Sequence, residues 1–331
     1  MHNQEQPIAA RTRSDAASAG LRAGSGRRSE SASFHGRVTR LRPALWFLLA
    51  LAGLYGLAVW SAIGQSTENA LVGGQTGGAA ILHWSLAAGL PPLKRGSAAL
   101  AGGVLLIAAV ALLRRRWREG AAGIGIAVAT VATAMTLHAV LPRPGLVPAS
   151  QALTGASFPS GTTAITAGLA LGAAVVASPS ARPYVAALGA LWLAVTAGAV
   201  QALSWHRPGD DLGATLLACA CHATATALLP RGEPGVRGDR GERAGARRSR
   251  ALPPLALAAA AALPASGRED SIVRPLVFAG AAFTCAALVW ITATGHSLRP
   301  GRLGPLRGRG QRIAQGCPRG DAQLGEHPVQ V

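Results

Sequence analysis

The sequence has few charged residues for its length. Only 14% of its 331 residues are Asp, Glu, Lys or Arg, whereas 50% are apolar; the charged share is about half of what soluble globular proteins carry. A chain of this length would ordinarily form two soluble domains of about 150 residues each, but it has too few charges to cover two such surfaces. The composition therefore favours an integral membrane protein.

Lysine is almost absent: Lys94 is the only lysine among the 32 basic residues, and all the others are arginines. With 14 acidic residues, the net charge is +18. A charge of this size could by itself indicate a nucleic-acid-binding protein. The arginines, however, lie between long uncharged stretches, and the sequence has no recognisable helix-turn-helix, zinc or aromatic RNA-binding motif. We therefore expect no nucleic-acid partner.

The four cysteines, Cys219, Cys221, Cys285 and Cys317, do not have the spacing of a metal site. The first three lie in apolar segments, where a free cysteine behaves as a small hydrophobic residue. We therefore expect neither a metal nor another cofactor.

Apolar stretches recur along the chain after a basic tail. Residues 1–42 are rich in Ser, Ala, Gly and Arg and contain no apolar run, which is typical of a disordered tail and not of a cleavable signal peptide. The domain 43–229 that follows holds six predicted membrane-spanning helices. They cover residues 44–63, 97–113, 121–141, 162–177, 184–203 and 212–229.

The remainder of the chain is predicted to add one or two membrane helices within residues 251–295, after a basic cytoplasmic loop at 230–250. Residues 272–294 are long enough to cross, whereas 252–263 are short. An even number of crossings would return the basic, disordered tail 296–331 to the cytoplasm, so eight is favoured over seven. The expected fold class is all-α, a polytopic membrane bundle with a six-helix core.

The arginines also predict the orientation, because basic residues near span ends are retained on the cytoplasmic side. Twenty basic residues lie in the amino-terminal tail and the alternate loops that share its side. The opposite loops carry only Lys94, Arg95, Arg143 and Arg207. The sequence therefore predicts a multi-pass protein of the cell membrane, with a cytoplasmic amino terminus and with the loops at 142–161 and 204–210 facing outward.

Those two outward loops hold three polar clusters. They are Arg143-Pro144, Ser157-Phe158-Pro159-Ser160-Gly161-Thr162, and His206-Arg207-Pro208-Gly209-Asp210-Asp211. A helix that begins after Pro159-Ser160-Gly161 presents unpaired N–H groups, which suit a phosphate oxygen, and Arg143 adds a planar, always-charged guanidinium. Asp210, four residues after His206, can hold one imidazole nitrogen protonated and leave the other free to attack.

Each cluster taken alone also has a structural interpretation. Ser160 is a common type of N-cap, Asp210 and Asp211 can cap the next helix, and Arg143 and Arg207 can lie at lipid headgroups. The occurrence of all three clusters on one expected face favours a functional site.

The three clusters resemble the motifs of the type 2 phosphatidic acid phosphatase family, which shares its site with bacterial acid phosphatases and vanadium haloperoxidases. The resemblance covers about residues 44–229. It implies that His206 is a nucleophile forming a phosphohistidine and that Asp210 orients it. Phosphate would then be bound by Arg143 and the segment Ser160, Gly161 and Thr162, with Arg207 beside it.

Three positions depart from the family pattern: Thr136 and Val200 replace a lysine and an arginine, and Thr162 replaces the histidine that serves as general acid. General acid catalysis contributes about 100- to 10,000-fold, and a phosphate leaving group needs the acid less than an alkoxide does. An active protein is therefore expected to prefer a diphosphate. His138 or Asp211 could substitute in part for the acid, but a core or capping role is favoured for each.

The resemblance thus predicts a membrane phosphatase that hydrolyses a lipid phosphate or polyprenyl diphosphate at the outer leaflet. A catalytically impaired relative that binds anionic headgroups without turnover is the main alternative. A small-solute transporter is less favoured, because the sequence has no internal helix repeat and no charged residue at the middle of a span. Nothing in the sequence indicates an oligomeric state.

Overall fold

The computed structural model describes residues 39–72, 91–149, 155–229, 252–265 and 273–295. The predicted loop 230–250, the predicted tail 296–331, Cys317 and most of the amino-terminal tail lie outside these ranges. Within them the chain is all-helical, as the sequence predicts. The helices are Thr39–Val59, α2 (Ala62–Val72), α4 (Gly96–Leu113), α5 (Trp117–Val140), α6 (Gly161–Val176), α7 (Arg182–Ala202), α8 (Pro208–Leu228), α10 (Leu252–Ala265) and α11 (Val273–Thr294).

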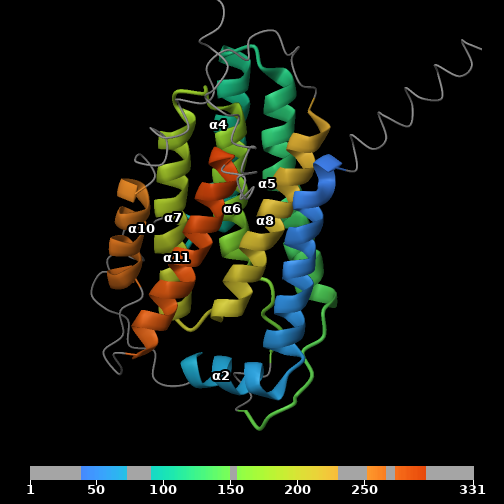
Figure 1. The fold of residues 1–331 in the computed structure, drawn as a ribbon, viewed down its shortest axis with the longest axis vertical. Helices are drawn as coiled ribbons and strands as arrows, with labels where there is room; N and C mark the ends of the chain where they lie inside the picture. The colour runs from blue at the N-terminus through green and yellow to red at the C-terminus, as the bar shows by residue number, and fades with distance from the viewer. Residues whose placement is uncertain (1–38, 73–90, 150–154, 230–251, 266–272, 296–331) are drawn as a thin grey trace, which may run out of the picture. The chain divides into compact units, whose positions relative to one another are not determined.

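Each predicted span corresponds to a helix, with two differences near the amino terminus. The first helix begins at Thr39, inside the region predicted to be a tail, and ends at Val59. A separate helix, α2, follows from Ala62 to Val72; it was not predicted, because its sequence mixes polar and apolar residues without a long apolar run. Figure 1 shows α2 lying across one end of the bundle.

Within the described residues, six helices are long and apolar enough to cross a membrane: Thr39–Val59, α4, α5, α7, α8 and α11. The preference for eight crossings is not supported by length, because α6 has 16 residues and α10 has 14. Both are shorter than the roughly 17 residues of the shortest transmembrane helices. Large apolar side chains such as Leu45, Leu105 and Leu188 are exposed on the outside of the bundle, as in a multi-pass membrane protein.

Helix α6 is the most enclosed part of the bundle, because twelve of its sixteen residues are buried. It packs against α4, α5, α7 and α8. Small residues permit this close packing: Gly172 of α6 faces Gly123 of α5, and a Cβ atom at Gly172 would overlap the backbone oxygen of Gly123. The short helix α10 packs on α7 and α11 (Figure 1).

The Gly172→Ala substitution is expected to destabilise the bundle, because its methyl group would push α5 away from α6. Overpacking of this kind typically costs about 1–3 kcal/mol. A thermal unfolding curve of the purified protein in detergent measures the effect. Gly125→Ala is the matched control, since nothing lies within 4 Å of the added Cβ atom. Equal unfolding temperatures for the two variants would contradict this description of the α5–α6 contact.

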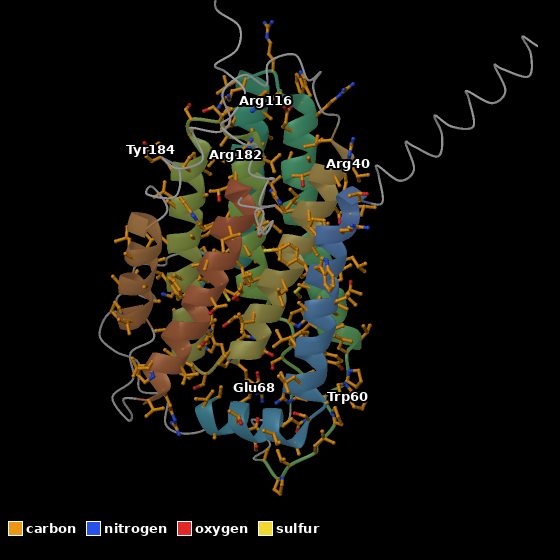
Figure 2. All side chains as sticks on the ribbon, in the orientation of Figure 1. Arg40, Trp60, Glu68, Arg116, Arg182 and Tyr184 are labelled. Atoms are coloured by element: carbon orange, nitrogen blue, oxygen red, sulfur yellow. The ribbon has the colours of Figure 1, made fainter. Side chains whose placement is uncertain are left out.

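The predicted basic side and the predicted site lie at opposite ends of the helices. Figure 2 shows Arg40, Arg116 and Arg182 toward one end of the bundle and Glu68 toward the other. The loops that follow α5 and α7 and precede α6 and α8 lie at the Glu68 end. The three sequence clusters therefore meet at the end of the bundle that α2 crosses (Figure 1).

Candidate active site

The start of α6 is fixed by its own cap and by a contact to α8. Ser160 is the N-cap, and its Oγ accepts a hydrogen bond from the Thr163 N–H at 3.3 Å. The Ser160 N–H in turn donates to the carbonyl oxygen of Asp210 at 3.0 Å. These contacts bring the second sequence cluster against the third.

The start of α8 is organised by Asp210. Pro208 occupies the first turn, where its missing N–H leaves no helix hydrogen bond unmade. Asp210 Oδ2 accepts the Arg207 N–H at 2.9 Å and lies 3.7 Å from His206 Nδ1. The second distance is that of an ion pair, too long for a hydrogen bond. Asp210 therefore has both roles considered for it, capping α8 and facing the histidine.

His206 lies in the α7–α8 turn, with 16% of its side chain exposed. Its Nδ1 faces Asp210, so Nε2 is the ring nitrogen left for another partner. Burial lowers the pKa of His206, but the carboxylates of Asp210 and Asp211 outweigh burial, so the pKa lies above its ordinary value.

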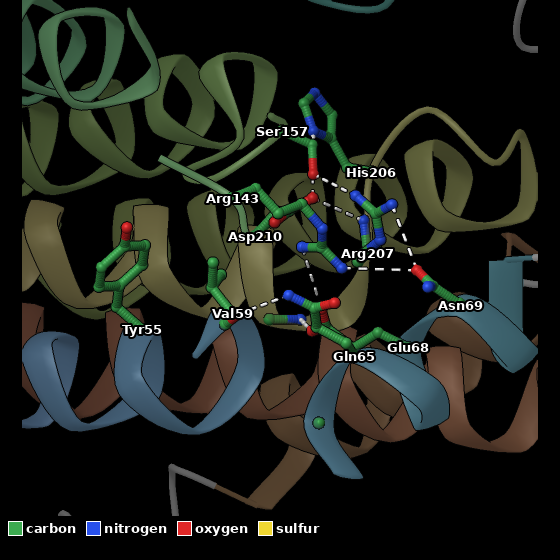
Figure 3. A network of polar contacts seen from close by, with 12 residues as sticks. Tyr55, Val59, Gln65, Glu68, Asn69, Arg143, Ser157, His206, Arg207 and Asp210 are labelled. Atoms are coloured by element: carbon green, nitrogen blue, oxygen red, sulfur yellow. Dashed lines mark hydrogen bonds and ion pairs between the residues drawn. The ribbon is translucent and has the colours of Figure 1, made fainter. Parts of the chain in front are cut away.

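Two guanidinium groups lie beside this pair (Figure 3). Arg143 Nη2 and Arg207 Nη2 both reach Asn69 Oδ1, at 3.4 and 3.5 Å, and Arg207 Nη1 also donates to Ser157 Oγ. Burial and the charge of Arg143 lower the pKa of Arg207 from its ordinary value. Two buried cations that share one neutral oxygen are expected to attract an anion strongly.

Helix α2 supplies the residues that the sequence did not predict. Gln65 Nε2 donates to the carbonyl oxygens of Val59 and Pro144, at 2.7 and 2.6 Å. Ser204 Oγ donates to the carbonyl oxygen of Val72 at 3.3 Å. Both ends of α2 are therefore attached to the site loops, which places Glu68 and Asn69 over the arginines.

Glu68 bridges α8 and Arg143. Its Oε1 accepts the Gly209 N–H at 3.0 Å, and its Oε2 lies 3.8 Å from Arg143 Nη1. Burial, followed by the nearby charge of Asp210, raises the pKa of Glu68 to about 7, against the opposing effects of Arg143 and Arg207. No sequence motif indicated Glu68, because its only contact with the clusters comes through the tertiary fold.

Asp211 lies behind the site and connects three helices. It accepts hydrogen bonds from Thr163 Oγ1 of α6 at 2.6 Å and from Gln201 Nε2 of α7 at 2.8 Å. Its side chain is fully buried. These contacts use both of its carboxylate oxygens and attach the start of α8 to α6 and α7.

The remaining predicted phosphate-binding residues lie at the start of α6. Ser160 is fully buried, and its hydroxyl bonds to Thr163. Gly161 begins α6, and Thr162 accepts a hydrogen bond from Thr166 through its carbonyl oxygen. Of the two other positions that depart from the family, Thr136 is exposed and Val200 belongs to an apolar cluster.

A shallow surface depression lies beside Arg143. Apolar side chains line it on one side, including Tyr55, Val59 and Phe158, while Arg143 and Ser157 contribute its polar part. Apolar side chains and the buried cation of Arg143 therefore lie next to each other at this end of the bundle, where the apolar and anionic parts of an amphiphile would contact them.

Comparisons of this chain with protein-family models, with curated proteins and with solved structures find no match. The chemistry of the site is therefore inferred from the residues that the structure brings together. It joins a histidine paired with a carboxylate, two buried guanidinium groups and a second carboxyl group whose proton is available near neutral pH. This set can bind a phosphate, attack its phosphorus atom and exchange a proton.

Proposed function

We propose that the protein is an integral membrane phosphatase that hydrolyses a lipid phosphate or a polyprenyl diphosphate through a phosphohistidine intermediate. One observation carries this proposal: the His206–Asp210 pair lies in the same buried cluster as the guanidinium groups of Arg143 and Arg207. The resemblance of the three sequence clusters to the type 2 phosphatidic acid phosphatases supports the same chemistry. It also supports membership of that family.

In the proposed reaction, Arg143 and Arg207 bind the phosphate oxygens, which carry charge through the transition state. His206 Nε2 attacks phosphorus while Asp210 orients the ring and stabilises its positive charge. Asp211 positions the start of α8 from behind through Thr163 and Gln201. Water then hydrolyses the phosphohistidine. No step in this scheme requires a metal ion or another cofactor.

The membrane location limits the kinds of phosphate that can be the substrate. The Arg-rich end of the bundle is expected to face the cytoplasm of the cell, by the retention of basic residues on that side, so the site faces outward. The apolar wall beside Arg143 supports an amphiphilic phosphate as substrate. A phosphorylated or diphosphorylated lipid in the outer leaflet satisfies both conditions.

The proposal is tested by measuring phosphate release by the purified chain in detergent. Lipid monophosphates and polyprenyl diphosphates are assayed in parallel with a non-lipid sugar phosphate. We expect His206-dependent release from the lipids and much less from the sugar phosphate. Protection against unfolding by an anionic lipid, with no release from any of these compounds, would instead support the alternative of a binding protein without turnover.

A further inference from the structure

We propose that Glu68 is the proton donor to the leaving group, the role left open by threonine at position 162. This inference rests on the proposed phosphatase function and concerns the same site. Helix α2, which lies across the end of the bundle, would then carry a catalytic residue.

Two buried polar atoms at the site face each other without a hydrogen-bond partner among the described residues. They are Glu68 Oε2 and Arg143 Nη1, which lie 3.8 Å apart. The two side chains are only 10% and 5% exposed. Buried polar atoms normally have hydrogen-bond partners, whereas this oxygen and this guanidinium nitrogen form only a long ion pair, so we place a ligand atom beside them. A substrate oxygen there would accept one hydrogen bond from Arg143 and one from protonated Glu68.

The arrangement also separates the donor from the nucleophile. Figure 3 shows His206 on one side of the two arginines and Glu68 on the other. Displacement at phosphorus requires the attacking and leaving atoms roughly in line on opposite sides. In this proposal a phosphate held by Arg143 and Arg207 lies between these two side chains, with His206 on the attacking side and Glu68 on the leaving side.

The protonation state of Glu68 suits an acid. With a pKa of about 7, the carboxyl group is protonated in about half of the molecules at neutral pH. The charged groups facing it are Arg143 from the loop after α5, and Arg207 and Asp210 from the start of α8. A bound phosphate adds negative charge beside Glu68 and favours its protonated form further.

The proton and electron balance of the reaction closes with these residues. In the first step the His206 lone pair forms the P–N bond, the P–O bond breaks, and its electron pair goes to the leaving oxygen, which takes the Glu68 proton. In the second step water attacks phosphorus and gives a proton to the Glu68 carboxylate. The P–N bond then breaks and its electron pair returns to His206.

Glu68→Gln is the sharpest test, because glutamine can still accept the Gly209 N–H but has no acidic proton. A short-chain phosphatidate has an alkoxide leaving group that needs the acid, whereas 4-nitrophenyl phosphate has a leaving group that does not. We expect kcat of Glu68→Gln to fall about 100- to 10,000-fold on phosphatidate and less than about tenfold on 4-nitrophenyl phosphate. The matched control is Ser66→Ala, an exposed position of α2, which should match the unmodified chain on both substrates.

The pH profile gives a second readout. The rate of the unmodified chain on phosphatidate should fall above about pH 7 as Glu68 loses its proton, and Glu68→Gln should lose this alkaline limb. An unchanged or increased rate on phosphatidate, or an equal loss on both substrates, would overturn the role of Glu68 alone. Absence of any His206-dependent turnover by the unmodified chain on both substrates would overturn the phosphatase function, and Glu68 as acid with it.

Discussion

The His206→Ala variant is expected to lose at least about a thousandfold in kcat on every phosphate substrate, because it removes the atom that forms the bond to phosphorus. The loss should be independent of the leaving group, unlike the loss in Glu68→Gln. Phosphate release by the purified variant, measured across phosphatidate and 4-nitrophenyl phosphate, checks both statements.

The same variant should remain folded. Asp210 still accepts the Arg207 N–H in the absence of the imidazole, so the cap of α8 is retained, and the unfolding temperature should change little. His138→Ala is the matched control, since His138 lies in α5 near the site end and was a candidate substitute for the acid. Full activity in His206→Ala, or a comparable loss in His138→Ala, would contradict the assignment of the nucleophile.

The Arg143→Gln variant is expected to lose about 100- to 1,000-fold in kcat/KM, the range seen when one preorganised donor to a transition-state anion is removed. Glutamine is shorter than arginine and uncharged, so the substitution withdraws the guanidinium donors and removes the positive charge. Binding of orthovanadate, an analogue of phosphate, should weaken in parallel. Steady-state kinetics and vanadate inhibition measure the two effects.

Arg143→Gln has a further consequence for pH dependence. The charge of Arg143 lowers the pKa of Glu68, so its removal should raise that pKa and move the alkaline limb to higher pH. Arg118→Gln is the control, because Arg118 is an exposed residue in the first turn of α5, at the opposite end of that helix from Arg143. If both arginine variants had the same kcat/KM as the unmodified chain, Arg143 would have no role in phosphate binding.

Most of the bundle could be predicted from the sequence, because membrane helices are long apolar runs and basic loops mark their ends. The ends of helices were harder to predict. The apolar run of the first span continues to Ile63, but the helix ends at Val59 and α2 begins at Ala62. Hydropathy averages over such a break, so the crossing α2 was not distinguished from the span before it.

The site was predictable where its residues lie close together in the sequence. His206, Arg207 and Asp210 share one turn, and their common location follows from local spacing. Arg143 could be added only through the expected topology. Glu68 and Asn69 lie more than 70 residues from Arg143, on a helix without an apolar pattern, and only the tertiary contacts place them at the arginines.

Chemical trapping of the intermediate shows whether His206 forms a covalent bond to phosphorus. The chain is mixed with ³²P-labelled lipid phosphate, denatured in alkali within a turnover, digested and analysed for labelled peptides. We predict an alkali-stable, acid-labile label on the peptide that carries His206, and no label in His206→Ala. Turnover by the unmodified chain without labelled protein, or a label that persists in His206→Ala, would contradict the account.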